Sequence, residues 1–246
     1  MDFNGRKYRL TIIVPVNNEE ENLPRLATEL FNYLKIAVVP TQVLFVNDGS
    51  TDNSEALIAS ICKNNNSFNY ISLRTNGGLS TALKAGFDII ETELTGYIDA
   101  DLQTLPRDFN ILLKHIDSND LVMGFRQKRK DAFLKYLSSI LANKFRRIFT
   151  RDGINDTGCP LKIIKTDFAK QLPLFKGMHR FLPALIQLQK GRVMQVPIEH
   201  YPRVFGKSHF NLPNRVLGTF IDCFIFLWIK KRFITYDISN SNTKPE

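Results

Sequence analysis

Apolar runs that alternate with helical patterns fill the first half of the chain, and this alternation constrains the fold more than any other feature. Residues 10–16 and 42–48 are runs of the kind found in buried strands. Between them, residues 21–34 carry leucines at helical spacing, and residues 50–63 open with helix-capping residue types. Strands that alternate with helices favour an α/β fold with a mostly parallel, doubly wound sheet.

Polar residues stand at the end of each predicted strand. In chain order they are Asn17, Asn18 and Glu19, then Asp48 and Gly49, then Asn76, Gly77 and Gly78, then Asp99 and Asp101, and finally Arg126. Ligands of doubly wound sheets bind outside the carboxyl ends of the strands. Successive polar ends on one edge therefore predict a binding site there.

The stretch TGYIDADLQTLP, residues 95–106, has two interpretations. It is an acidic turn at a strand end, or it is a metal site. On an extended chain, Asp99, Asp101 and Gln103 share one face and present hard oxygen ligands that suit Mg²⁺ or Mn²⁺. Two carboxylates this close repel each other, so one takes a proton unless a cation lies between them.

Two further stretches allow both a structural and a functional interpretation. VNDGSTDNS is a turn followed by a helix cap, or it offers Asp48 as an acceptor for the N–H groups of a nucleobase. NGGLSTALKAG is glycine-rich, but it lacks both the GxGxxG pattern and a GK[ST] ending. It is therefore not evidence for a Rossmann or a P-loop site.

The formal net charge of +9 suggests an anionic partner. Nucleic acid is the least favoured, because the basic clusters lack interleaved aromatic residues and no recognition motif is present. Three scattered cysteines argue against a disulfide framework or a zinc site and favour a reducing, cytoplasmic location. The first ten residues lack the apolar core of a signal peptide.

The second half of the chain is predicted to extend the first domain and to close over the strand ends, rather than to form an independent domain. A basic helical stretch is expected at about 130–150, a helix near 180–189, and a long apolar helix with a basic end at 216–233. The last of these lies on a membrane, packs on a partner or caps the core. The predicted organisation is a catalytic domain at 1–210, with a nucleotide-binding half at about 9–126 and a closing half at about 127–210, then the helix at 211–236 and a polar tail at 237–246.

Several motifs occur in an order that resembles family 2 glycosyltransferases of the GT-A fold. They are IIVPVNNEEENL, VLFVNDGSTDNS, NGGLSTALKAGFD, YIDADLQTLP and VMGFRQKR. The later stretches DTGCPLKIIK and VPIEHYPRVFGKSHF resemble the branch with dolichyl-phosphate mannose synthase and bacterial polyprenyl-phosphate sugar transferases. The resemblance covers roughly residues 9–215.

The resemblance implies roles for individual residues. Those implied for the nucleotide-sugar donor are Pro15, Asn17, Glu19, Asp48 and Asp99, although Asn17 stands where the family often has an aromatic residue. Those implied for Mg²⁺ or Mn²⁺ are Asp99, Asp101 and Gln103. Those implied for catalysis are Asp101, Arg126, Asp156 and the basic closing loop with Arg203 and Lys207. Ser139 matches a serine near the acceptor phosphate.

Charge arguments favour a phosphate as the acceptor. A phosphate monoester is mostly dianionic at neutral pH, so it needs cations rather than a general base. Arg129 and Lys130, together with Arg126, Arg203 and Lys207, supply such cations. The predicted enzyme is an inverting, metal-dependent transferase that moves a sugar to a polyprenyl phosphate, peripherally on the cytoplasmic face of the membrane.

Two other functions stay open from the sequence. One is transfer to a glycan hydroxyl in cell-envelope polysaccharide synthesis, with Asp156 or His179 as the base. The other is a non-catalytic module that binds a nucleotide-sugar or a lipid phosphate. In the stretch MHRFLP, residues 178–183, the sequence allows His179 and Arg180 either a structural role or contact with the acceptor. The oligomeric state does not follow from the sequence.

Overall fold

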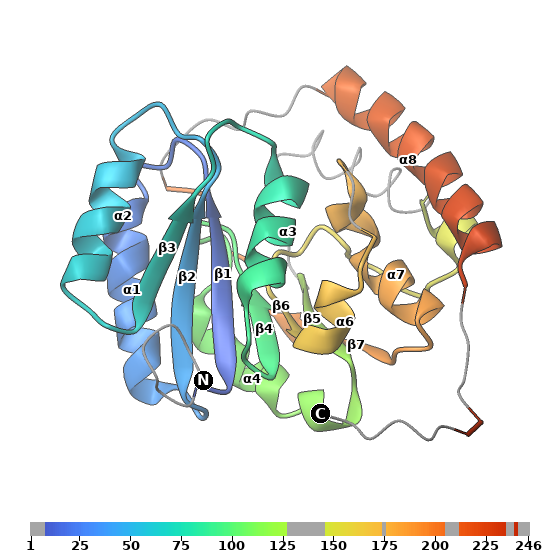
Figure 1. Cartoon of the computed structure of the whole chain (residues 1–246), viewed down its shortest axis with the longest axis horizontal. Coiled ribbons are helices and arrows are strands. Elements are labelled where there is room, and N and C mark those ends of the chain that lie inside the picture. Colours follow the sequence, from blue (N-terminus) through green and yellow to red (C-terminus); the bar gives the residue numbers. More distant parts are fainter. Residues whose placement is uncertain (1–7, 127–145, 174–175, 205–211, 235–238, 241–246) are drawn as a thin grey trace.

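The computed structural model describes residues 8–126, 146–173, 176–204, 212–234 and 239–240 (Figure 1). The strands are β1 (Leu10–Val16), β2 (Thr41–Asn47), β3 (Phe68–Ser72), β4 (Leu94–Tyr97), β5 (Leu121–Arg126), β6 (Lys162–Lys165) and β7 (Val193–Ile198). The α-helices are α1 (Leu23–Ile36), α2 (Ser54–Lys63), α3 (Leu79–Ile89), α4 (Phe109–Leu113), α6 (Thr166–Lys170), α7 (Leu182–Leu188) and α8 (Leu212–Arg232). The 3₁₀ turns are η1 (Pro106–Asp108), η2 (Ile116–Ser118) and η3 (Met178–Phe181).

These strands form one sheet in the order β3-β2-β1-β4-β6-β5-β7. The pairs β1·β2, β1·β4, β2·β3 and β5·β7 are parallel, whereas β6 runs antiparallel to both β4 and β5. The predicted α/β fold with a mostly parallel sheet is therefore confirmed. Strand β6, which lies between two parallel parts of the sheet, was not expected from the sequence.

Helices cover both faces of the sheet, and this explains the continuous apolar runs of the inner strands. Every residue of β2 is buried. One core packs α1, α2 and α4 against the sheet, and a second core packs α3, α6, α7 and α8 against the other face. Figure 1 shows α3 in front of the strands and α1 and α2 behind them. Parallel strands buried on both faces need no polar alternation.

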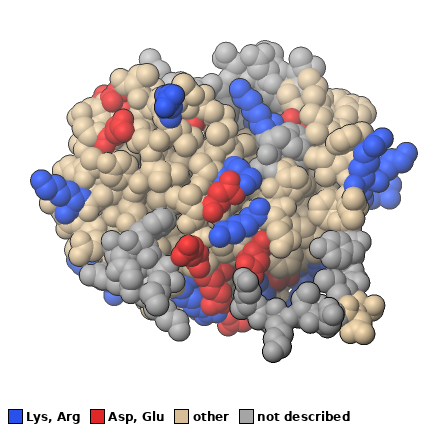
Figure 2. Space-filling view, in the orientation of Figure 1, with Lys and Arg blue, Asp and Glu red and all other residues tan. Residues whose placement is uncertain are grey.

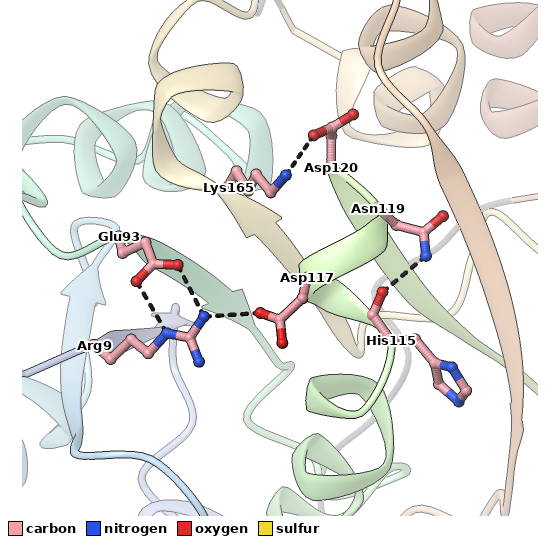
Figure 3. A network of polar contacts seen from close by, with 7 residues as sticks. All are labelled: Arg9, Glu93, His115, Asp117, Asn119, Asp120 and Lys165. Carbon is pink, nitrogen blue, oxygen red and sulfur yellow. Dashed lines mark hydrogen bonds and ion pairs between the residues drawn. The ribbon is translucent and has the colours of Figure 1, made fainter.

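Ion pairs join several elements at the sheet edge opposite the strands' carboxyl ends (Figure 3). Arg9, just before β1, contacts Glu93 at 2.9 Å and Asp117 at 2.9 Å. Lys165, at the end of β6, contacts Asp120 at 2.9 Å. The Arg9 pairs are largely exposed, so each contributes little to stability. The charged residues at this edge therefore contact one another and join elements of the fold. The candidate site lies at the opposite edge, where the parallel strands have their carboxyl ends.

Helix α8 carries an exposed apolar stripe. Its buried side chains include Asp222, Cys223 and Phe226, which face the second core. Among the side chains of the helix that the structure describes, the exposed apolar ones include Phe220, Ile221, Phe224, Leu227 and Trp228. Figure 2 shows a basic cluster at the right-hand edge, at the C-terminal end of α8, where the last turn contains Lys230, Lys231 and Arg232. Within the described ranges, every helix falls short of the length or apolarity needed to cross a membrane.

Candidate active site

The loops after β1 and β2 are tied together at the carboxyl edge of the sheet. Pro15 lies near the end of β1, and Asn17 follows the strand and donates from Nδ2 to the Asp48 carbonyl at 2.8 Å. Asn18 has a φ of 55°, and its Oδ1 accepts the Thr51 N–H at 2.8 Å. Asparagine tolerates this left-handed conformation better than most residues. Pro15, Asn17 and Asp48 are therefore neighbours, as predicted for donor-binding residues.

Glu19 takes part in the start of two helices. Its backbone N–H donates to the Ser54 Oγ at 2.9 Å, at the first residue of α2. Its Oε2 accepts the Asn22 Nδ2 at 2.6 Å, just before α1. These contacts give Glu19 a structural role in the loop. Its contact with a donor stays a prediction.

The Asp48 carboxylate holds the glycine loop that precedes α3. Its Oδ1 accepts the Gly77 N–H at 2.8 Å and its Oδ2 accepts the Gly78 N–H at 2.7 Å. Asp48 is 3% exposed, and Gly78 has a φ of 83°, which suits glycine. The same loop approaches so closely that a Cβ on Gly49 would lie 2.6 Å from the Asn76 nitrogen. Asp48 thus shapes the edge of the site, and its contact with a nucleobase stays a prediction.

Asp99 lies just beyond β4 in a partly buried position. The Tyr97 hydroxyl donates to its Oδ1 at 2.6 Å. Burial, followed by the negative charge of Asp101, raises the pKa of Asp99 to about 6, although Tyr97, Lys162 and Arg203 act in the opposite direction. A further positive charge near the Asp99 and Asp101 carboxylates would therefore favour the ionised form of both.

Asp101 is 4% exposed and lies between a backbone N–H and a guanidinium. Its Oδ1 accepts the Gln103 N–H at 3.1 Å, and its Oδ2 accepts the Arg203 Nη2 at 2.6 Å. Asp99, Asp101 and Gln103 were expected on one face only if the chain stayed extended, and this condition is not met. The chain turns after β4, and Leu102 has a φ of 54°. Gln103 contacts Asp101 through its backbone, and a metal contact from its side chain stays a prediction.

Arg126 and Asp156 form a bidentate ion pair. The Arg126 Nε donates to Oδ2 at 2.7 Å, and its Nη2 donates to Oδ1 at 2.8 Å. The side chains are only 9% and 10% exposed. Close packing reinforces the pair, because a Cβ on Gly158 would lie 3.1 Å from Arg126 Nη2. Asp156 therefore orients the arginine that ends β5, a role that the sequence alone did not indicate.

Lys162 is a buried lysine whose charge acts on Asp99, and it was given no role from the sequence. It pairs with Tyr97 in the antiparallel register of β4 and β6. Its ammonium donates to the Cys159 carbonyl and lies 5.2 Å from the centre of the Tyr97 ring. Burial lowers the pKa of Lys162, whereas nearby acidic groups that include Asp99 raise it. In the sequence it appeared only within the stretch DTGCPLKIIK.

The η3 turn and the residue before it contact both the start of α3 and α8. The Ser80 Oγ and the His179 Nδ1 are 2.9 Å apart, and the Gly177 N–H donates to Ser80 Oγ at 3.2 Å. Arg180 Nη1 lies 3.6 Å from Asp222 Oδ2. Burial raises the pKa of Asp222, and Arg180 partly offsets this effect. His179 and Arg180 both have protein partners, which agrees with the structural interpretation of this motif.

Residues 11–172 match the family described as Glycosyl transferase family 2. The chain belongs to glycosyltransferase family 2. Among curated proteins, this glycosyltransferase is 28% identical over 234 residues to the dodecaprenyl-phosphate galacturonate synthase of Rhizobium johnstonii. The match covers 91% of this chain and 68% of that protein. Activity as a glycosyltransferase and the resemblance to the polyprenyl-phosphate branch are thereby confirmed.

Solved structures with the same fold include glucosyl-3-phosphoglycerate synthase from Mycobacterium tuberculosis. Its complex with Mn²⁺, UDP and glucosyl-3-phosphoglycerate matches with a TM-score of 0.68 at 14% identity, over 88% of this chain and 80% of that one. The complex of the same enzyme with Mg²⁺ and UDP matches with a TM-score of 0.66 at 14% identity, over 88% and 79%. At this identity the likeness shows the GT-A fold.

The predicted site of this family 2 enzyme is only partly within the described residues. The structure brings Asp48, Asp99, Asp101, Arg126 and Arg203 to the carboxyl edge of the sheet. Four predicted residues lie outside the described ranges, namely Arg129, Lys130, Ser139 and Lys207. Among the residues that are described, His, Cys, Asp and Glu form no cluster of three or more that could hold a metal.

Proposed function

We propose that this family 2 glycosyltransferase moves a sugar, with inversion, from a nucleotide-sugar to a polyprenyl phosphate, using Mg²⁺ or Mn²⁺. The relative from Rhizobium supports this acceptor, because that protein is named a dodecaprenyl-phosphate galacturonate synthase and the match spans most of this chain. The structural relatives that bind Mn²⁺ or Mg²⁺ together with UDP support the metal.

The residues at the Asp99–Asp101 turn fit a divalent ion. Their carboxylates are near enough for Asp101 to raise the pKa of Asp99, and a guanidinium already lies 2.6 Å from Asp101 Oδ2. Mg²⁺ is commonly held by one or two carboxylates together with substrate phosphates, so a donor diphosphate would supply the missing ligands. When bound, the ion would neutralise the negative charge that develops on the leaving diphosphate.

The observation that carries the choice of acceptor is the Arg126–Asp156 pair. A sugar hydroxyl needs a general base to remove its proton, and Asp156 is a candidate for that role. Both of its oxygens are engaged by Arg126, at 2.7 and 2.8 Å. The other candidate, His179, has its Nδ1 2.9 Å from Ser80 Oγ. A phosphate dianion needs no base, so this arrangement favours a phosphate acceptor.

The proposed transfer is a single displacement at the anomeric carbon. A phosphate oxygen of the acceptor forms the new bond, while the bond from the anomeric carbon to the donor's diphosphate oxygen breaks. The electron pair of that bond leaves with the nucleoside diphosphate, and attack from the opposite face inverts the configuration. Arg126 and Arg203, both beside site carboxylates, supply positive charge near the two phosphate groups.

We also propose that α8 lies on the cytoplasmic face of the membrane. Its exposed stripe ends at Trp228, which is 61% exposed and has the Arg232 guanidinium 5.3 Å from its ring centre. Aromatic residues beside Lys and Arg suit an interface between apolar chains and anionic headgroups. Each basic residue near such headgroups contributes about 1 kcal/mol. A second copy of the helix would instead bring like charges together.

An assay of lipid-linked product tests the acceptor. The purified protein is incubated with labelled nucleotide-sugars, Mg²⁺ or Mn²⁺ and a polyprenyl phosphate, and the label in the organic phase is measured. We expect label there with at least one donor. Transfer to a water-soluble saccharide would support a glycan hydroxyl as the acceptor. Donor binding without transfer or donor hydrolysis would support a non-catalytic module.

The metal role has a matched control. Asp101→Asn removes a carboxylate bound to an arginine in the site, and we expect it to lower the transfer rate about a hundredfold or more. Asp117→Asn removes a carboxylate that contacts Arg9 Nη2 at 2.9 Å on the opposite edge, and it should keep wild-type activity. Activity that survives both EDTA and Asp101→Asn would contradict the metal role.

Flotation with lipid vesicles tests α8. We expect the protein to float with vesicles that contain phosphatidylglycerol and less with pure phosphatidylcholine, and salt should weaken the binding. Trp228→Ser should reduce flotation, whereas Phe31→Ser, which changes a 45% exposed side chain on α1, should not. Equal flotation of all three proteins would refute the placement of α8 on the membrane.

A further inference from the structure

The segment that leaves β7 is fastened to the loop that carries Asp101 and Gln103. The Tyr201 N–H donates to the Gln103 carbonyl at 3.0 Å. The Arg107 Nη2 donates to the Tyr201 hydroxyl at 3.0 Å, and this hydroxyl donates to the Glu199 carboxylate. Tyr201 is thus held by both its backbone and its side chain.

This attachment determines where Arg203 lies. Only Pro202 separates it from Tyr201, and the ring of proline restricts the backbone between them. Arg203 Nη2 reaches Asp101 Oδ2 at 2.6 Å. The Asp101 side chain is 5% exposed, whereas that of Arg203 is 27% exposed. A carboxylate so deeply buried needs a cationic partner, while the arginine side chain is partly exposed.

We propose that Tyr201 is a positioning residue that holds Arg203 on Asp101 in the donor-free protein. The Arg203 guanidinium then supplies the positive charge beside Asp101 until a divalent ion and a nucleoside diphosphate bind together. This inference rests on the proposed metal role of Asp101. A guanidinium at Oδ2 repels a divalent ion that arrives alone. A diphosphate offers Arg203 a second anionic partner, so nucleotide and metal strengthen each other's binding.

Binding of Mn²⁺, with and without UDP, tests this inference independently of activity. The free ion is measured by its electron paramagnetic resonance signal. Arg203→Gln should tighten Mn²⁺ binding in the absence of nucleotide by about tenfold. It should also reduce the factor by which UDP enhances that binding. Arg203→Lys keeps the charge and should bind Mn²⁺ alone as weakly as the wild type.

Tyr201→Phe tests the positioning role. It removes the hydroxyl contacts with Arg107 and Glu199 without changing the amino acid at position 203. Mn²⁺ binding without nucleotide should tighten by a smaller factor than in Arg203→Gln. Affinity equal to that of the wild type would show that Tyr201 does not position Arg203. Circular dichroism identifies any variant that fails to fold.

Arg9→Gln is the matched control, because it removes an arginine that contacts carboxylates on the opposite edge. It should leave Mn²⁺ binding unchanged. The inference is overturned if Arg203→Gln binds Mn²⁺ alone no more tightly than the wild type, or if Arg203→Lys tightens binding equally. If Mn²⁺ binds to neither the wild type nor the variants even with UDP, the proposed metal cofactor fails too. If it binds with UDP but residue 203 has no influence, only this inference fails.

Discussion

The Arg126–Asp156 pair allows a quantitative test of how the site is held. Asp156→Asn keeps the shape of the side chain but removes the carboxylate that accepts two hydrogen bonds from the Arg126 guanidinium, which is only 9% exposed. Removing one partner of a buried ion pair costs about 3–5 kcal/mol. The backbone N–H of Arg126 lies 3.3 Å from Asp156 Oδ2 and keeps an acceptor in the variant. We therefore expect the free energy of unfolding to fall by about 3 kcal/mol, at the lower end of that range.

A double-mutant cycle separates this pair from its surroundings. Urea unfolding, followed by circular dichroism at neutral pH, gives the free energy of unfolding for Asp156→Asn, Arg126→Gln and the double variant. We expect a coupling energy of about 2 kcal/mol, because the two side chains share two short hydrogen bonds. Additive losses, with coupling below about 0.5 kcal/mol, would refute the conclusion that each side chain holds the other.

Further predictions concern two other parts of the fold. Burial acts against ionisation of Asp120, but the Arg192 N–H and Lys165 outweigh it and lower its pKa. Its charge therefore stabilises the fold at neutral pH, and this contribution is lost as the pH falls through the lowered pKa. Asp120→Asn should lower the free energy of unfolding by about 1–2 kcal/mol at pH 7. In urea titrations, the difference in unfolding free energy between the wild type and this variant should become smaller below about pH 4. Gly49→Ala should destabilise by about 3 kcal/mol, because the new Cβ meets a backbone atom at 2.6 Å. Gly153→Ala has a similar φ but nothing within 4 Å, and should cost about 1–2 kcal/mol in thermal unfolding. Equal losses for the two alanines would contradict the close approach at Gly49.

Much of the fold was predictable because the inner strands have strong local signals. The runs that became β1 and β2 are mostly apolar, and a helix with spaced leucines follows β1. Strand β6 was missed because Lys162–Lys165 has four residues, and its pairing partners come from distant parts of the chain. Strand β4 is equally short, but the polar residues that follow it marked it in the sequence.

The site was predictable in its location but not in its contacts. Polar residues at strand ends placed Asp48, Asp101 and Arg126 on one edge. Their partners are non-local, since Asp101 binds an arginine 102 positions away and Arg126 binds a carboxylate 30 positions away. The left-handed Leu102 also escaped prediction, because leucine has no preference for that conformation.

The antiparallel strand β6 has a consequence for the order in which the protein folds during synthesis. Strand β4 is complete at Tyr97, but its neighbour on one side is β6, which begins only at Lys162. Until the ribosome has released that segment, β4 presents an unpaired edge, and β5 has nothing to join it to the rest of the sheet. Exposed edges of this kind recruit other chains. A fragment ending near Arg126 should therefore aggregate, and the nascent enzyme should depend on chaperones until β6 closes the gap.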